Sequence, residues 1–214
     1  NVVLSILSGA STVNVTATAG AITEVLAGEG ANIIGTTATL NAVTGIGSAD
    51  DIDTQITAID ATNTGAGNIQ INEIAAGTNI NVLDISQTDG TVTGTGNILL
   101  TTEAGTIDVL AAGTGVVTAG TGTITLTSVG GSSDVLVNDV VTSTTGTIQI
   151  NAGRDITNTA IISASGAGVI DLNAASAINQ QANITSGGGV ITADATAGAI
   201  TMLDGKLTQT SGAG

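Results

Sequence analysis

Aliphatic and polar residues alternate in a short phrase that recurs along the chain. The phrase is Gly, any residue, Ile, any residue and then a large aliphatic residue, and such alternation indicates a β-strand with one buried face. Clear copies occupy residues 67–71, 96–100, 122–126, 146–150 and 168–172. Weaker copies begin at Gly20, where Glu24 replaces the second aliphatic residue, and at Gly189. In the segment that begins at Gly45, Gly47 stands where Ile is expected.

The phrases divide the chain into nine segments of 19 to 29 residues. These are 1–19, 20–44, 45–66, 67–95, 96–121, 122–145, 146–167, 168–188 and 189–214. The two most regular segments, 146–167 and 168–188, carry further aliphatic residues ten and sixteen positions after their opening Gly, namely Ile156, Ile162, Ile178 and Ile184. Three aliphatic clusters in each segment predict one coil with three short strands.

This pattern predicts an all-β fold, a parallel β-helix (β-solenoid) of about nine coils of 19–29 residues, as a single domain over residues 1–214. One coil cannot bury its apolar face alone, but stacked coils share a continuous core. At about 4.8 Å per coil, the rod would be roughly 43 Å long. We expect a right-handed coil, the usual hand of parallel crossovers. An antiparallel sandwich is the alternative, although it does not require the same phrase in every segment.

Asn follows the phrase three times, as Asn72, Asn151 and Asn173. Asn tolerates the left-handed backbone conformation, so we expect a turn at these positions.

The composition suits a narrow aliphatic core. The chain has 31 Gly, no Phe, Trp, Tyr, Pro, Cys or His, and a formal net charge of −15. The absence of Pro spares the ladder hydrogen bonds of central strands. Without His or Cys the chain lacks the commonest general base and the cysteine nucleophile. Two basic residues cannot neutralise a phosphate backbone, and no apolar run is long enough to span a membrane, so we expect neither nucleic-acid binding nor membrane insertion.

Two segments carry a resemblance to a known family. Residues 146–156 read Gly-Thr-Ile-Gln-Ile-Asn-Ala-Gly-Arg-Asp-Ile, and residues 168–174 read Gly-Val-Ile-Asp-Leu-Asn-Ala. They resemble filamentous-haemagglutinin-type repeats, the β-helical shafts of large secreted bacterial adhesins, including two-partner-secretion exoproteins and autotransporter passenger domains. The resemblance is clearest over residues 67–205. It implies an extracellular or cell-surface location and a structural or adhesive role.

The acidic cluster Asp50-Asp51-Ile52-Asp53 is the clearest candidate for metal binding, because Ca²⁺ prefers several carboxylate oxygens close together. It lacks the spaced Asp, the Gly and the distal Glu of a calcium loop, and the chain has no Gly-Gly-x-Gly-x-Asp nonapeptide. A solvated acidic loop is therefore the favoured interpretation, and calcium binding by Asp50, Asp51 and Asp53 stays open.

Catalytic residues are not expected. Sugar-cleaving enzymes need two carboxylates that face one another, whereas we expect Asp171 on the outward side of a strand and Asp194 at a corner. The basic residues are Arg154 and Lys206, and we expect Arg154 to form a surface pair with Asp155 worth under about 1 kcal/mol. We therefore predict no enzyme activity, no cofactor and no metal.

Two further motifs have structural interpretations. The Thr-x-Thr runs in 91–95 and 123–127 are typical of ice-binding solenoids when the threonines align on one face. The outward position of the phrase instead holds a mixed set, which is Thr23, Gln70, Leu99, Thr125, Gln149, Asp171 and Thr192. The Gly-x-Gly pieces at 65–67 and 94–96 precede predicted strands and lack the Lys of a phosphate loop, so they predict turns.

The first and last segments suggest assembly. Residues 1–7 are largely apolar, and joining Gly214 to Asn1 would continue the phrase as Gly-Asn-Val-Val-Leu. We expect coils to continue across this junction, between copies stacked head to tail or within one longer chain. The sequence favours a non-catalytic structural or adhesive shaft, whose partners are other copies of itself and a host or neighbouring-cell surface or polysaccharide. A polysaccharide-binding or polysaccharide-degrading β-helix is the alternative.

Overall fold

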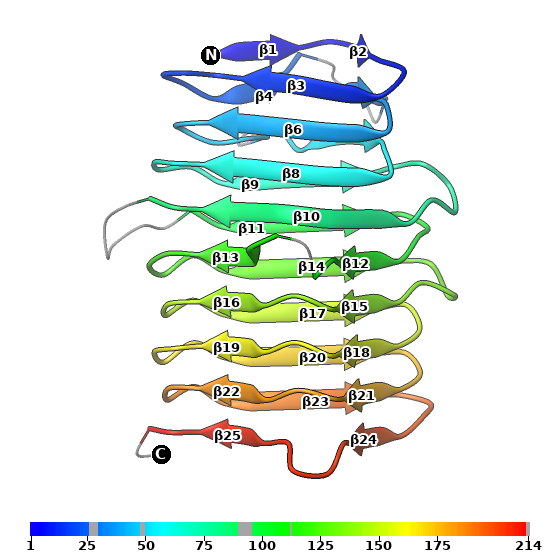
Figure 1. The fold of residues 1–214 in the computed structure, drawn as a ribbon, viewed down its shortest axis with the longest axis vertical. Helices are drawn as coiled ribbons and strands as arrows, with labels where there is room; N and C mark the ends of the chain where they lie inside the picture. Colours follow the sequence, from blue (N-terminus) through cyan, green and yellow to red (C-terminus); the bar gives the residue numbers. More distant parts are fainter. Residues whose placement is uncertain (26–29, 48–49, 90–95, 112, 213–214) are drawn as a thin grey trace.

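The chain winds into a rod of stacked β-coils. A computed structural model describes residues 1–25, 30–47, 50–89, 96–111 and 113–212 (Figure 1). Within these residues there is no helix, and every strand pair is parallel, each strand lying beside the equivalent strand of the next coil. The fold is the predicted β-solenoid. Its hand stays a prediction.

One wall of the solenoid runs the length of the rod. It contains β1 (Val2–Leu4), β4 (Ile22–Glu24) and the path β2 (Leu7–Ser8), β5 (Ile33–Ile34), β7 (Ile52–Gln55), β9 (Ile69–Glu73), β11 (Ile98–Thr102), β14 (Ile124–Ser128), β17 (Ile148–Ala152), β20 (Ile170–Ala174) and β23 (Ile191–Ala195). The nine strands of that path, all within the described residues, are separated by about eight turns of the chain.

The other two walls are formed by separate strands in only part of the rod. The first four coils use the single strands β3 (Thr12–Thr16), β6 (Thr37–Ala42), β8 (Ala58–Asn63) and β10 (Ile80–Gln87). Later coils use two strands each, which are β12 (Ile107–Val109) and β13 (Gly115–Thr118), β15 (Val135–Val137) and β16 (Val141–Ser143), β18 (Ile156–Asn158) and β19 (Ile162–Ala164), β21 (Ile178–Gln180) and β22 (Ile184–Ser186), and β24 (Ile200–Met202) and β25 (Thr208–Thr210).

The prediction of three short strands is therefore confirmed for the later coils and for the first two, which contain β1–β3 and β4–β6. It is wrong for the third and fourth coils, which contain β7 and β8, and β9 and β10. The change occurs at β10, which pairs with both β12 and β13 (Figure 1). The register of β10 against β8 shifts between Val82 and Asp84. At this irregularity β10 bends from one wall into the next while staying one continuous strand.

A column of isoleucines forms the spine of the core. Val2 pairs with Ile22 and Ile22 with Ile46, both in register. The column continues through Ile69, Ile98, Ile124, Ile148, Ile170 and Ile191. From Ile22 to Ile170 these side chains are at most 1% exposed. A β-branched side chain has few rotamers, so identical residues stack without losing much conformational freedom.

The third coil is irregular in sequence but keeps two isoleucine pairs with the next coil. Ile46 pairs with Ile69, and the strand partner of the next inward residue, Ile71, is Ile52. Gly47 N donates to Ile22 O of the preceding coil at 2.9 Å, and Gly47 has a positive φ of 64°. The inward positions are both filled by isoleucine, although the local sequence does not show the phrase.

The expected turns at asparagine are not present. Asn72, Asn151 and Asn173 lie inside β9, β17 and β20, and no described non-glycine residue has a positive φ. Two of these side chains form a ladder across the coils: Asn173 Nδ2 donates to Asn151 Oδ1 at 3.1 Å, and Asn151 Nδ2 donates to Thr127 Oγ1 at 3.2 Å. The amides therefore link neighbouring strands instead of turning the chain.

The opening glycines of the phrase stack at one corner of the coil. A Cβ on Gly122, Gly146 or Gly168 would lie closer than 3.0 Å to the carbonyl oxygen of the corresponding glycine one coil earlier. Buried hydroxyl groups bridge the same corner, because Ser143 Oγ accepts from Gly146 N at 2.9 Å and donates to Gly122 O at 3.2 Å. The glycine of the phrase is thus required for close approach of the coils.

We predict that Gly146→Ala lowers the free energy of unfolding by about 1–3 kcal/mol, the usual cost of overpacking. Gly131→Ala is the matched control, because a Cβ there meets no heavy atom within 4 Å, and we expect a change within about 0.5 kcal/mol. Urea unfolding followed by circular dichroism measures both. Equal stability of the two variants would contradict the role given to the glycine corner.

Candidate functional site

The structure divides the acidic cluster instead of leaving it as a solvated loop. Asp50 is exposed and Asp51 is half-buried, but Asp53 is 2% exposed within β7. Asp53 N donates to Asn32 Oδ1 at 2.9 Å, and Asp53 Oδ1 accepts from Asn72 Nδ2 at 3.2 Å. The interpretation as a solvated loop is therefore wrong for Asp53, which is part of a polar ladder across three coils.

Glu24 lies close to this cluster, although it is far from it in the sequence. Burial raises the pKa of Glu24, a hydrogen bond with Asn32 lowers it, and the nearby carboxylates of Asp50 and Asp51 raise it further. Glu24 Oε2 is buried without a hydrogen-bond partner among the described residues. The only signal in the sequence was an acidic residue at a position where the phrase requires an aliphatic one.

The described residues contain no group of three or more acidic side chains placed to hold a metal ion. Residues 48 and 49, which precede Asp50, are outside the described part of the chain. The geometry therefore gives no support to a calcium site at Asp50, Asp51 and Asp53.

The position predicted for Asp194 is wrong. Asp194 lies inside β23, where it pairs with Asn173, and not at a corner. Asp171 is one strand away on the same outward face, and its carboxylate accepts from Thr192 Oγ1 at 2.5 Å and from Asn173 Nδ2 at 3.1 Å. The two carboxylates thus share a wall, which the sequence analysis did not expect.

Arg154 has a different principal partner from the one predicted. Its guanidinium forms a two-pronged ion pair with Asp134 of the preceding coil, with Nε donating to Oδ1 at 2.7 Å and Nη2 donating to Oδ2. Asp155, the predicted partner, lies farther away, with 3.6 Å between its Oδ2 and Arg154 Nε. The pair links two coils on the surface. Lys206 is half-buried in the last described coil.

Glu73 is a fully buried carboxyl group that the sequence analysis did not single out. Its Oε2 accepts from Thr54 Oγ1 at 2.8 Å and from Ile56 N at 3.0 Å, and its Oε1 accepts from Ala75 N at 3.0 Å. Burial raises the pKa of Glu73, and these hydrogen bonds partly oppose that rise. The contacts fix the backbone on either side of a corner, which is a structural role.

The outward columns are mixed, as predicted. Gln70, Leu99, Thr125, Gln149, Asp171 and Thr192 pair in this order along the first wall. This sequence of side chains has no repeated Thr lattice of the kind that binds ice. The Gly-x-Gly piece at residues 65–67 precedes β9, as expected. The Thr-x-Thr runs in 91–95 lie outside the described part of the chain, and so does most of the Gly-x-Gly piece at 94–96, of which only Gly96 is described.

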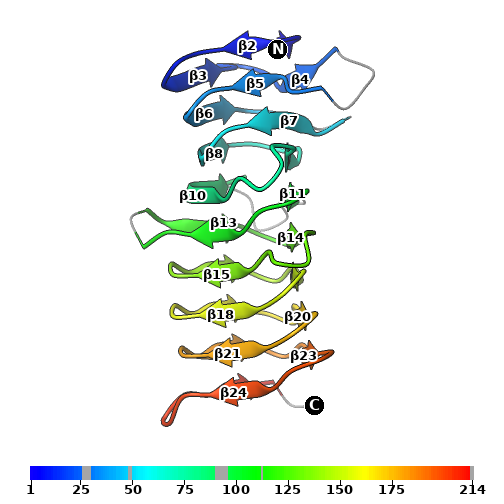
Figure 2. The same cartoon turned by 90° about the vertical axis from the view of Figure 1, so that its right-hand side faces the viewer.

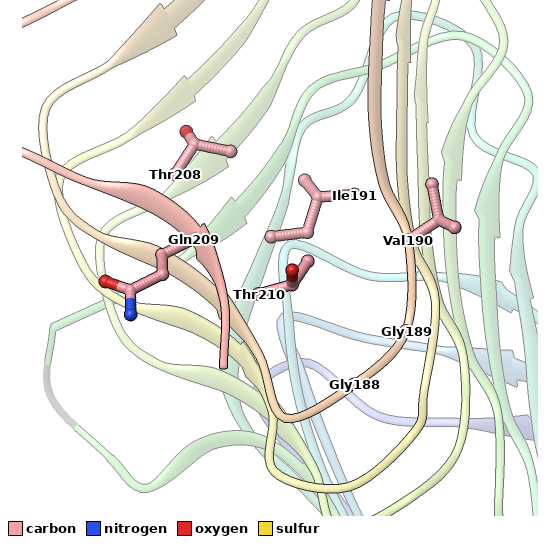
Figure 3. A pocket seen from close by; sticks show the side chains of 7 residues that line it. All are labelled: Gly188, Gly189, Val190, Ile191, Thr208, Gln209 and Thr210. Atoms are coloured by element: carbon pink, nitrogen blue, oxygen red, sulfur yellow. The ribbon is translucent and has the colours of Figure 1, made fainter. Parts of the chain in front are cut away.

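The last described coil exposes side chains that earlier coils bury. Ile200 and Met202 of β24 are each 52% exposed, whereas Ile178 at the equivalent position one coil earlier is 1% exposed. A pocket of about 420 Å³ opens between β23 and β25 (Figure 3). Ile191 and Thr210 point into this space, while Val190 and Gln209 point away from it (Figure 3).

No family model matches the chain, and no curated protein and no solved structure matches it. No helix in the described part of the chain is long and apolar enough to cross a membrane.

Three carboxyl groups with raised pKa values, of which Glu73 is fully buried, predict how stability depends on pH. The pKa values of Glu24, Asp60 and Glu73 are raised in the folded chain, with burial as the largest cause in each. A raised folded-state pKa gives stability that is fully present below the unfolded-state value and is lost as the pH rises through the folded-state value. We therefore expect a lower free energy of unfolding at about pH 7.5 than at about pH 4.5.

Urea unfolding at these two pH values checks this expectation. In Glu73→Gln the loss of stability between them should be smaller than in the unaltered chain, because one buried titrating group is gone. Asp204→Asn, at an exposed position in the last coil, should leave the loss unchanged. If Glu73→Gln lost as much stability between the two pH values as the unaltered chain does, the raised pKa of Glu73 would be contradicted.

Proposed function

We propose that the chain is a non-catalytic structural and adhesive shaft segment of an extracellular bacterial surface protein or filament. The observation that carries the proposal is the uninterrupted core: one hydrophobic cluster includes residues from Leu4 to Ile184 and therefore spans nearly every coil. A repeated core of this kind makes length, and not a particular side-wall site, the property that the sequence maintains.

The charge distribution supports a rod that stays separate along its sides. The chain carries a formal net charge of −15, and the exposed walls consist largely of Thr, Asn, Gln, Ser and Asp. Like charges on neighbouring rods oppose lateral association. The extracellular location and the adhesive role rest on the resemblance to filamentous-haemagglutinin-type repeats.

The polysaccharide alternative has one observation in its favour, the shared outward face of Asp171 and Asp194. Asp171 is already hydrogen-bonded to two neighbours, and the chain has no aromatic residue on which a sugar ring could stack. Binding or cleavage of an acidic or neutral polysaccharide that is lost in Asp171→Asn and retained in Asp204→Asn would favour this alternative over the shaft.

Force spectroscopy tests the shaft proposal. Pulling the chain from its two ends should release coils one or a few at a time, because each coil contacts only its neighbours. Coils of 19 to 29 residues lengthen by roughly 65–100 Å when extended, so the steps should be multiples of this length. Release of the whole chain in a single low-force event would argue against a load-bearing shaft.

A further inference from the structure

The outward face of strands β6, β8 and β10 presents polar side chains in coils that are stacked on both sides. Each of these strands pairs with a neighbouring strand on either side, and the three follow one another along the rod (Figure 2). Buried and partly exposed residues alternate along them. Two in-register columns of partly exposed residues form what we call the β6–β8–β10 face, which are Thr39, Asp60 and Asp84, and Asn41, Thr62 and Ser86.

The side chains of the β6–β8–β10 face are largely free of hydrogen bonds. Asp84 accepts from Thr114 Oγ1 at 2.6 Å, and none of the other five forms a side-chain hydrogen bond within the part of the chain that the structure describes. Later coils differ, because in the column of Ser86 the hydroxyl of Thr185 donates to Ser163 Oγ at 3.0 Å. The hydroxyl, amide and carboxylate groups of this face are therefore available to an external ligand.

Asp60 and Asp84 give the face a negative charge without an internal counter-charge. They are in register on neighbouring strands, which places their Cα atoms about 4.8 Å apart. The two basic side chains, Arg154 and Lys206, lie in later coils, and neither forms an ion pair with this pair of carboxylates. Burial raises the pKa of Asp60, and the carboxylate of Asp84 raises it further. A positively charged group from outside would relieve the repulsion between the two carboxylates.

We propose that the β6–β8–β10 face binds a polysaccharide that carries free amino groups. An ammonium group of the polymer lies at the carboxylates of Asp60 and Asp84, and sugar hydroxyls form hydrogen bonds with Thr39, Asn41 and Thr62. The inference rests on the proposed shaft function and deepens its adhesive part, because it names a class of ligand and the wall that holds it.

The charge and composition of the face favour this ligand over other polysaccharides. An acidic polysaccharide is repelled by the two carboxylates and by the net charge of −15. A neutral polysaccharide would have to bind without aromatic stacking, because the chain has no Phe, Trp or Tyr. An amino polysaccharide gains charge-assisted hydrogen bonds, which are about twice as strong as neutral ones. The face therefore complements a cationic polymer with hydroxyl groups.

Calorimetric titration with an oligomer of glucosamine tests the proposal, at a mildly acidic pH at which the amino groups are charged. The N-acetylated form of the same oligomer is the neutral probe. We expect the amino form to bind and the N-acetylated form to bind at least about tenfold more weakly, because acetylation removes the positive charge. Added salt should weaken binding of the amino form.

Two double variants separate the local site from the net charge of the chain. Asp60→Asn/Asp84→Asn should weaken binding of the amino form about tenfold, because both carboxylates at the ammonium group are lost. Asp171→Asn/Asp204→Asn removes the same amount of charge outside the face and should change the affinity less than about twofold. Circular dichroism checks that both variants keep the fold.

No binding by the unaltered chain, equal binding of the two forms of the oligomer, or an equal effect of the two double variants would overturn the proposal. These results would leave the shaft intact, because stepwise unfolding under force is measured without a ligand. Loss of that stepwise unfolding would instead contradict the shaft.

Discussion

The close approach of successive coils at the glycine corner is the constraint on which the rest of the structure depends. The carbonyl oxygen of one glycine occupies the space that a Cβ of the next would need, as at Gly122, Gly146 and Gly168. Ser143 and Ser186 use their hydroxyl groups to bridge the same corner. With this spacing fixed, the isoleucine column can stack in register along the whole wall, and the strands of the other walls are held at the same rise.

The polar contacts between coils lie on the side walls, whereas most of the aliphatic residues lie in the core. The outward positions of the described walls hold a mixed set of mostly polar side chains, and their contacts, such as the Arg154–Asp134 pair and the Asn173–Asn151 ladder, link one coil to the next. Exposed aliphatic groups that belong to the core occur at the end coils. Length is therefore the property that follows most directly from the structure.

The sequence predicts the features that depend on local periodicity. The columns through Ile156 and Ile162 follow from equal spacing in neighbouring segments, and the structure confirms both pairs. Contacts that depend on how far a corner extends could not be predicted. The partner of Arg154 comes from a different coil, Glu24 lies near Asp50 and Asp51 of the next coil, and the burial of Asp53 depends on the polar ladder around it. Periodicity gives the order of coils but not the lateral path of the chain between strands.

The most direct test of this account is disulfide trapping within one chain, at positions that pair in neighbouring coils. Asn151 and Asn173 are in register, and Asp194 lies one strand beyond Asn173. Adjacent coils place the Cα atoms about 4.8 Å apart, within disulfide range, and positions two coils apart lie beyond it. The account predicts an intramolecular disulfide in Asn151→Cys/Asn173→Cys and none in Asn151→Cys/Asp194→Cys. The reverse result, or no difference between the two pairs, would contradict the parallel in-register stack.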